Sequence, residues 1–203
     1  NDYKKIDDQN NKSNESIKTF ESFELKNISY TYPNNSNLIL DDISLKFYKN
    51  ETIGIIGPSG SGKTTLVDLI LGLLTPSSGE VFINDLDIKK FGLSNWHKNV
   101  AYLPQEAFLV DEVIEKNVTL KNDNLDKDEK NIKLKNINDA IVRSNLKKFV
   151  NNLPLGLNTQ IGERGVRLSG GQKQRIIFAR AFYHKRNFFI LDESTSSLDY
   201  ETE

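Results

Sequence analysis

The sequence predicts an α/β fold, and two observations support that prediction. The apolar, β-branched run at 52–56 is followed by a glycine-rich loop and a mostly apolar stretch at 65–72, which is typical of strand, loop and helix in that order. The apolar run at 188–191 ends in two carboxylates, which indicates a second strand buried on both faces. At 203 residues the chain has the length of one such domain, with room for a small subdomain.

Further elements follow from residue type and periodicity. Runs of β-branched and aromatic residues predict strands at 23–32, 43–47, 81–83 and 100–103. Apolar residues at helical spacing predict helices over 137–150 and 170–182. We expect a turn at 76–79, and a surface connection or frayed helix in the Lys/Asn/Asp-rich stretch 121–138.

Composition excludes several classes of protein. The net charge is -1, from 27 basic and 28 acidic side chains, so no bulk field attracts nucleic acid, and we expect no nucleic-acid partner. The absence of cysteine excludes disulfides and thiolate metal sites. No run approaches the roughly 18 apolar residues that cross a bilayer, so we expect these residues to be soluble.

Residues 1–19 differ from the rest of the chain, because they carry almost no apolar side chains. Such a segment cannot offset the entropy of ordering, so we expect a flexible linker over 1–19 and a single folded domain over 20–203. A tether from a preceding domain and a disordered tail both fit this composition.

The segment 57–64 matches the pattern G-x-x-x-x-G-K-[ST] between a predicted strand and a predicted helix. Glycines let backbone N–H groups converge on phosphate oxygens, and the helix N-terminus adds its positive dipole end. Lys63 is expected to contact the terminal phosphates, and the Thr64 hydroxyl to bind Mg²⁺. The phosphate-binding residues are therefore expected to be Gly57, Pro58, Ser59, Gly60, Ser61, Gly62, Lys63, Thr64 and Thr65.

Asp192 and Glu193 follow the predicted strand at 188–191, where open α/β sheets place their ligands. Asp192 is suited to hold the metal, and Glu193 to orient and deprotonate an attacking water. Taken alone, such a pair is more often a helix cap or a turn. Because the chain also carries the segment 57–64, metal binding and catalysis become the better interpretation of this pair.

Two glycines open the predicted helix at 170–182, directly after Ser169. The exposed N–H groups of Gly170 and Gly171, with the Ser169 hydroxyl, form a second anion site on the same chain. A plain helix cap needs only the serine. The segment 168–172 has the sequence LSGGQ, and here the chain resembles the nucleotide-binding domain of exporter-type ABC transporters over residues 20–199.

The resemblance implies a P-loop NTPase core with a mixed sheet, an antiparallel β subdomain and an α-helical subdomain. It implies an ATPase that uses ATP and Mg²⁺, with Ser169, Gly170, Gly171 and Gln172 covering the nucleotide of a partner. Tyr32 matches the aromatic residue that stacks on adenine, and Gln105 matches the glutamine that meets Mg²⁺ and the attacking water. Residues 196–199 match the loop after the catalytic glutamate, and residues 163–165 match a stretch of exporter cassettes.

The resemblance also implies partners and a location. We expect an ATP-dependent dimer with a second nucleotide-binding domain, most simply a second copy. We expect a transmembrane domain, N-terminal on the same polypeptide, that holds the cassette at the cytoplasmic face of the cell (inner) membrane. The cargo is expected to be amphipathic. The family's γ-phosphate histidine and last core strands fall downstream of Asp199, so we expect the cassette to be incomplete at its C-terminus.

Other classes share these motifs. Chromosome-maintenance and DNA-repair ATPases separate them by a long coiled coil, whereas here about a hundred residues without heptads intervene. A soluble translation factor with two fused cassettes acts on the ribosome. Transmembrane spans in the full-length gene favour transport, and a second cassette without spans favours the ribosome. A small-molecule kinase has no use for the LSGGQ segment.

Overall fold

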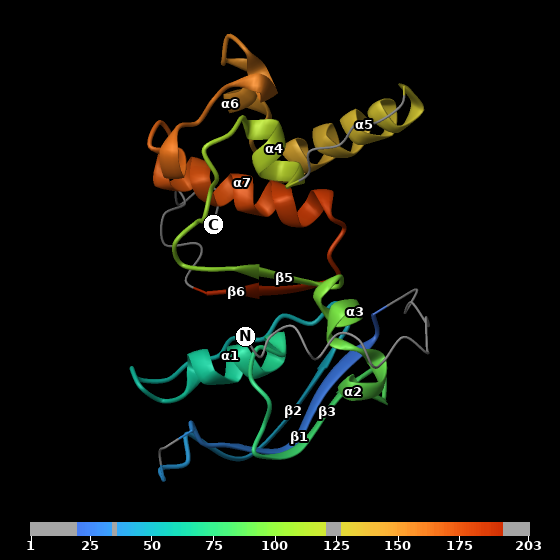
Figure 1. Cartoon of the computed structure of the whole chain (residues 1–203), viewed down its shortest axis with the longest axis vertical. Coiled ribbons are helices and arrows are strands. Elements are labelled where there is room, and N and C mark those ends of the chain that lie inside the picture. Colours follow the sequence, from blue (N-terminus) through green and yellow to red (C-terminus); the bar gives the residue numbers. More distant parts are fainter. Residues whose placement is uncertain (1–19, 34–35, 121–126, 193–203) are drawn as a thin grey trace. The chain divides into compact units, whose positions relative to one another are not determined.

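The structure is a computed structural model that describes residues 20–33, 36–120 and 127–192 (Figure 1). The chain divides into two compact units, Asn1–Val100 and Ala101–Glu203. A four-stranded sheet dominates the first unit, and helices dominate the second.

The sheet of the first unit is antiparallel, in the order β2-β1-β3-β4. Strand β1 lies between two others, so that Leu25 pairs with Leu45 on one side and with Val81 on the other. This central place buries the apolar side chains of β1. The strands are β1 (Ser22–Tyr30), β2 (Leu40–Tyr48), β3 (Ser78–Ile83) and β4 (Leu86–Asp87).

The strands predicted at 23–32, 43–47 and 81–83 are confirmed, with shifted ends. Strand β3 begins within the predicted turn at 76–79. The short strand β4 was not predicted, because it follows β3 through a two-residue hairpin of Asn84 and Asp85. Both residues have positive φ, 49° and 61°, which is the conformation that two-residue hairpin turns require.

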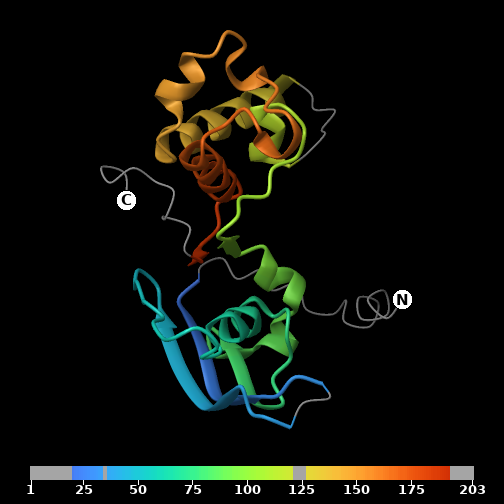
Figure 2. The ribbon, with the colours of Figure 1, turned by 90° about the vertical axis from the view of Figure 1, so that its left-hand side faces the viewer.

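Helix packing against this sheet centres on Trp96, the chain's single tryptophan. Its fully buried ring stacks on Phe23 of β1 at 5.1 Å between centroids, and its indole N–H donates to the Ile70 carbonyl at 2.7 Å. The contacts place α1 and α3 on the Phe23 face of the sheet (Figure 2). The helices of this unit are α1 (Lys63–Leu71), α2 (Ile88–Phe91) and α3 (Leu93–His97).

The prediction of a buried strand at 52–56 is wrong. These residues form no strand, and Ile53, Ile55 and Ile56 are 49%, 40% and 95% exposed. A strand buried on both faces needs a neighbour on each edge and a layer over each face. In the described structure, neither sheet includes this segment.

The second unit has a two-stranded sheet and a helical bundle. Strands β5 (Val100–Leu103) and β6 (Phe188–Leu191) are neighbours and run in the same direction in Figure 1. The strand at 188–191 is confirmed, but its predicted burial is wrong, since Phe189 and Leu191 are 37% and 50% exposed. In the described residues β5 is its only neighbour, so burial on both faces does not follow.

Helix α7 is the centre of the bundle, and α4 and α5 pack against it (Figure 1). Its apolar face, with Ile176 and Ala179, joins Val118, Ile137 and Ala140 in one buried cluster. The helices are α4 (Ile114–Thr119), α5 (Lys127–Arg143), α6 (Lys147–Asn151) and α7 (Gly170–Tyr183), with 3₁₀ turns at Gly156–Asn158 and Glu163–Gly165.

Two helix predictions change in detail. The helix predicted over 137–150 is broken, because Asn145 has a φ of 58° between α5 and α6. The polar stretch predicted as a connection or frayed helix belongs to α5 from Lys127 onward. The predicted fold class, with an antiparallel β part and a helical part, is confirmed. Within the described ranges, no helix combines the length and the apolarity needed to cross a bilayer.

Candidate functional site

The glycine-rich segment 57–64 leads directly into α1. Gly60 and Gly62 have φ of 80° and 88°, in the left-handed region that favours glycine. Gly62 also lies close to neighbouring backbone, since a Cβ there would come 3.2 Å from the Ile39 carbonyl oxygen. The glycines therefore allow the sharp turn that brings the loop to the start of the helix.

The donors of this loop are suited to an anion. Gly62 is the N-cap of α1, and no side chain caps the helix, so the N–H groups of its first turn keep their capacity for a ligand. The Lys63 ammonium donates to the carbonyls of Gly57 at 2.8 Å and Pro58 at 2.9 Å. These bonds hold the cation beside the loop, of which residues 57–61 and Thr64 are exposed and Gly62 and Lys63 are half-buried. The residues present fit a polyphosphate.

The structure brings Tyr32 to this loop. The Tyr32 hydroxyl and Thr65 Oγ1 are 3.1 Å apart, and the ring meets Tyr30 edge-on at 5.0 Å between centroids. Tyr32 is 39% exposed, so part of its surface stays available for another planar group. The hydroxyl bond to Thr65 was not expected, because it joins residues 33 positions apart.

Asp192 and Gln105 follow the ends of β6 and β5. The Asp192 N–H donates to the Leu103 carbonyl at 3.0 Å, and the Tyr102 hydroxyl donates to Asp192 Oδ2 at 3.1 Å. Because the two strands run in the same direction, both residues lie at the carboxyl edge of this small sheet (Figure 1). Glu193 and residues 196–199 lie outside the described residues.

The donor set here suits a metal that is also held by a ligand. The described residues contain no cluster of three or more His, Cys, Asp or Glu side chains fit for a metal. Mg²⁺ is usually held by one or two carboxylates together with substrate phosphates, rather than by an all-protein cage. A single carboxylate such as Asp192, oriented by Tyr102, fits that pattern.

The second glycine motif begins α7. The Ser169 side chain accepts from the Gln172 N–H at 3.3 Å, and Gln172 Oε1 accepts from the Ser169 N–H at 3.0 Å, which is a capping box. Ser169 and Gly170 are exposed. The cap uses one N–H of the first turn, so those of Gly170 and Gly171 keep their capacity for a ligand.

Two residues of α7 that the sequence did not predict bind the backbone of the segment that begins at Gln105. Gln174 Nε2 donates to the Gln105 carbonyl at 3.1 Å. The Arg180 guanidinium donates to the Phe108 carbonyl at 3.2 and 3.3 Å and to the Asn117 carbonyl at 2.9 Å. Burial lowers the pKa of Arg180. No sequence signal marks these residues, because their partners are 63 to 72 positions away.

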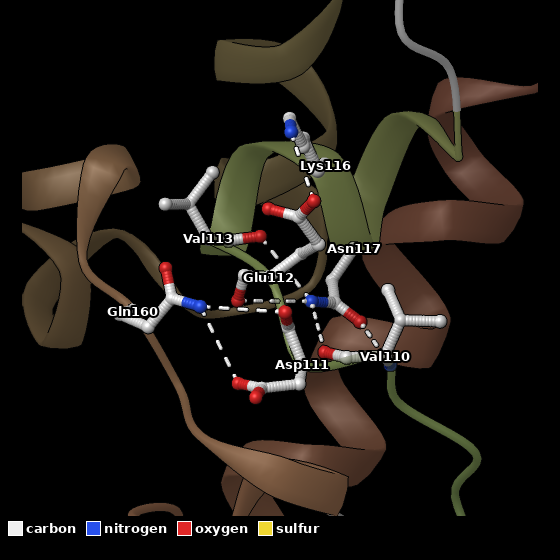
Figure 3. A network of polar contacts seen from close by, with 7 residues as sticks. All are labelled: Val110, Asp111, Glu112, Val113, Lys116, Asn117 and Gln160. Atoms are coloured by element: carbon white, nitrogen blue, oxygen red, sulfur yellow. Dashed lines mark hydrogen bonds and ion pairs between the residues drawn. The ribbon is translucent and has the colours of Figure 1, made fainter.

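Asn117 completes this set (Figure 3). Its fully buried carboxamide accepts from the Val110 N–H at 2.9 Å and donates to the carbonyls of Val110, Glu112 and Val113 at 3.0, 3.4 and 3.2 Å. On the other side of the same segment, Gln160 donates to Asp111 at 3.3 Å (Figure 3). Backbone groups of the segment 105–113 thus accept or donate many of the hydrogen bonds that fix it, and the side chains of Asp111 and Glu112 add contacts with Gln160 and Lys116.

Comparison with known proteins gives the family. A family model described as ABC transporter matches residues 40–196. The chain is 41% identical over 183 residues to a Rickettsia typhi protein described as an export ATP-binding/permease protein, covering 90% of this chain and 31% of that protein. It is 42% identical over 176 residues to ABC transporter B family member 29, chloroplastic, of Arabidopsis thaliana, covering 87% of this chain and 27% of that protein.

A solved structure agrees. A bacterial Atm1-family ABC exporter with ATP bound matches with a TM-score of 0.79 at 28% identity, over 91% of this chain and 31% of that chain. The chain thus spans less than a third of the length of each of these proteins. It belongs to the ABC transporter family, and it carries that family's ATP-binding domain in its exporter-type form.

Proposed function

We propose that this chain is the ATP-hydrolysing motor of a membrane exporter and that it works as one of a pair. The observation that carries the proposal is the exposed N-terminus of α7. Its glycines leave N–H donors that no group of the same motif uses, on a chain that already has a phosphate loop at 57–65. Because the loop already binds the phosphates of one nucleotide, the second anion site is free to bind the nucleotide of another domain.

The nucleotide-binding roles follow from the first unit. Tyr32 stacks on the adenine ring, and the loop 57–65 donates backbone N–H groups to the phosphates. The Lys63 ammonium lies beside the loop, where it can contact the terminal phosphates of a bound nucleotide. Thr64 lies in the first turn of α1, and its hydroxyl is the group that would hold Mg²⁺.

The hydrolytic roles belong to residues that follow β5 and β6. Asp192 and Gln105 would hold the Mg²⁺ that contacts the phosphates, and the hydrogen bond from Tyr102 orients the Asp192 carboxylate. Mg²⁺, when bound, neutralises charge that develops on the phosphate oxygens. Glu193 takes a proton from the attacking water as the water oxygen bonds to the γ-phosphorus and the bond to the ADP oxygen breaks.

Residues 169–172 of the partner close the site. Ser169, Gly170 and Gly171 donate to the γ-phosphate of the other domain, a contact that is lost after the γ-phosphate leaves. Because ATP then stabilises the closed pair more than ADP does, hydrolysis opens it. The paired domain is most simply a second copy of this chain.

The similarity to export ATP-binding/permease proteins supports a transmembrane domain N-terminal on the same polypeptide. On this proposal the ATP-binding domain lies at the cytoplasmic face of the membrane. The paired domains drive export or flipping of an amphipathic substrate, whose recognition belongs to the membrane segments.

Replacing the proposed base tests the motor. Glu193→Gln keeps the size and shape of the side chain but cannot accept the proton, so ATP stays bound and the pair stays closed. We expect the full-length variant to retain ATP and to lose turnover by at least about a hundredfold. The measurements are phosphate release and light scattering with and without ATP. Unaltered turnover removes Glu193 from the role of base.

A further inference from the structure

We propose that Gln174 and Arg180 are positioning residues that tie the placement of Gln105 to helix α7. The proposal rests on the proposed function, since it assigns to that site the residues that place its glutamine. Both residues lie on the helix that begins at the LSGGQ motif, and both donate to backbone carbonyls of the segment that carries Gln105.

The first contact is made by Gln174, two residues after Gln172. Its side chain is 2% exposed, and its Nε2 donates to the Gln105 carbonyl at 3.1 Å. Within the described residues, its Oε1 is buried without a hydrogen-bond partner. A buried amide oxygen without a partner costs stability, so an apolar side chain of the same size suits the packing better. An apolar side chain cannot make the hydrogen bond to the Gln105 carbonyl, and this bond is therefore the reason for a glutamine at this position.

The second contact is made by Arg180, six residues further along α7, or about 9 Å along the helix axis. Its guanidinium joins two elements, because it donates to the Phe108 carbonyl and to the Asn117 carbonyl in α4. The planar fork of arginine suits two acceptors at once, and the ammonium of lysine does not. Helix α7 therefore binds the segment 105–108 through two hydrogen-bonding side chains, at Gln105 and at Phe108.

The far end of the segment is held by α4. The Asn117 carboxamide binds Val110, Glu112 and Val113 through their backbone (Figure 3). With that end fixed to α4 and α4 fixed to Arg180, the freedom that remains is at the Gln105 end, where Gln174 binds. A displacement of α7 when residues 169–172 engage a phosphate therefore moves the Gln105 backbone with it.

The decisive variant is Gln174→Met, which keeps nearly the same volume and removes the amide. We expect the full-length protein to bind ATP with an unchanged Kd and to lose about tenfold in kcat. A misplaced Gln105 reduces the stabilisation of the transition state but does not reduce the affinity for ATP. Arg180→Gln is expected to do the same, and Arg180→Lys to give an intermediate kcat. Arg143→Gln is the matched control, since Arg143 contacts Asp139 and the Phe182 ring and lies on α5.

A second readout separates positioning from stability. The 203 residues contain no cysteine, so Phe108→Cys, at a side chain that is 68% exposed, accepts a nitroxide at one place in this chain. We expect Gln174→Met to make the nitroxide more mobile in nucleotide-free protein, with the melting temperature unchanged or raised. Remaining cysteines elsewhere in the full-length protein are replaced first.

The outcomes are distinct. An unchanged nitroxide spectrum, or an equal loss in Arg143→Gln, overturns the positioning role. A lowered melting temperature without any split between kcat and Kd also overturns it, because that pattern is a folding defect. Absence of ATP turnover in the unmodified protein contradicts the proposed function instead, and the nitroxide readout still decides the placement of the segment by itself.

Discussion

The side chain of Lys63 is held in one place by the loop that it is proposed to serve. Its ammonium already contacts two carbonyls of the loop, Gly57 and Pro58, so little rotamer freedom remains to be lost when phosphates enter. The same bonds stabilise the turn at 57–58. A change at this residue therefore acts on the nucleotide site directly.

We predict that Lys63→Ala weakens ATP binding about 10- to 100-fold, because it removes charge-assisted hydrogen bonds worth about 1.5–3 kcal/mol. Isothermal titration of ATP into the full-length protein measures the Kd. Lys49→Ala is the control, since Lys49 pairs with Glu21 at 3.4 Å on an exposed surface. Unchanged affinity in Lys63→Ala removes this residue from the phosphate site.

Residue types and their spacing are enough to predict the loop 57–64 and the motif 168–172, because both chemistries depend on contiguous residues. Tyr102 could not be predicted in the same way. Its partner Asp192 is 90 positions away, and only the pairing of β5 with β6 brings the two together. Local pattern identifies which groups react, and tertiary structure decides which groups orient them.

Elements were predicted best where the period of apolar residues is uninterrupted. Helix α7 is an example, since its apolar positions run from the glycine pair to Tyr183 with polar residues on the other face. The stretch at 137–150 has the same spacing, but Asn145 takes a left-handed conformation and ends it. Asparagine adopts that conformation at little cost, and periodicity does not register it.

The run at 52–56 was predicted wrongly for a different reason. Apolar, β-branched residues indicate a strand only together with strands to pair with, and sequence alone does not provide those neighbours. In the described structure Ile56 is 95% exposed. The prediction thus depended on non-local pairing, which is the part of a fold that local pattern leaves open.

The start of α4 depends on Asn117, and this gives a prediction on stability. Asn117→Leu keeps the size of the side chain but removes the acceptor of the Val110 N–H, whereas the carbonyls of Val110, Glu112 and Val113 each keep one backbone donor. We predict a loss of about 2 kcal/mol in the free energy of unfolding, because the Val110 N–H loses its acceptor and three carbonyls lose a second donor. Urea unfolding followed by far-UV circular dichroism reports on the helical unit.

Two comparisons make this measurement specific. Asn138→Leu, at an exposed position of α5, is expected to change the free energy of unfolding by no more than about 0.5 kcal/mol. Trp96 fluorescence reports on the first unit, because the single tryptophan is buried against Phe23 there. An equal loss in both asparagine variants contradicts a specific role for Asn117.

At the scale of the whole molecule, the proposed function implies that the two motifs of one chain serve two different nucleotides. In a head-to-tail pair, each site takes the loop 57–65 from one chain and residues 169–172 from the other. A substitution in the loop 57–65 of one chain therefore affects one site of the pair, and a substitution in residues 169–172 of the same chain affects the other site. This arrangement differs from a chain in which both motifs act on the same nucleotide, and the difference is measurable.

We predict that Lys63→Ala and Ser169→Arg each abolish ATP-dependent pairing alone, and that a mixture of the two variants restores it. The mixed pair keeps one undamaged site, because the Ser169→Arg chain supplies its loop and the Lys63→Ala chain supplies its Ser169. Co-purification of two differently tagged full-length variants, with and without ATP, measures the recovery. If both motifs act on one nucleotide within a chain, mixing restores nothing, and the head-to-tail arrangement is wrong.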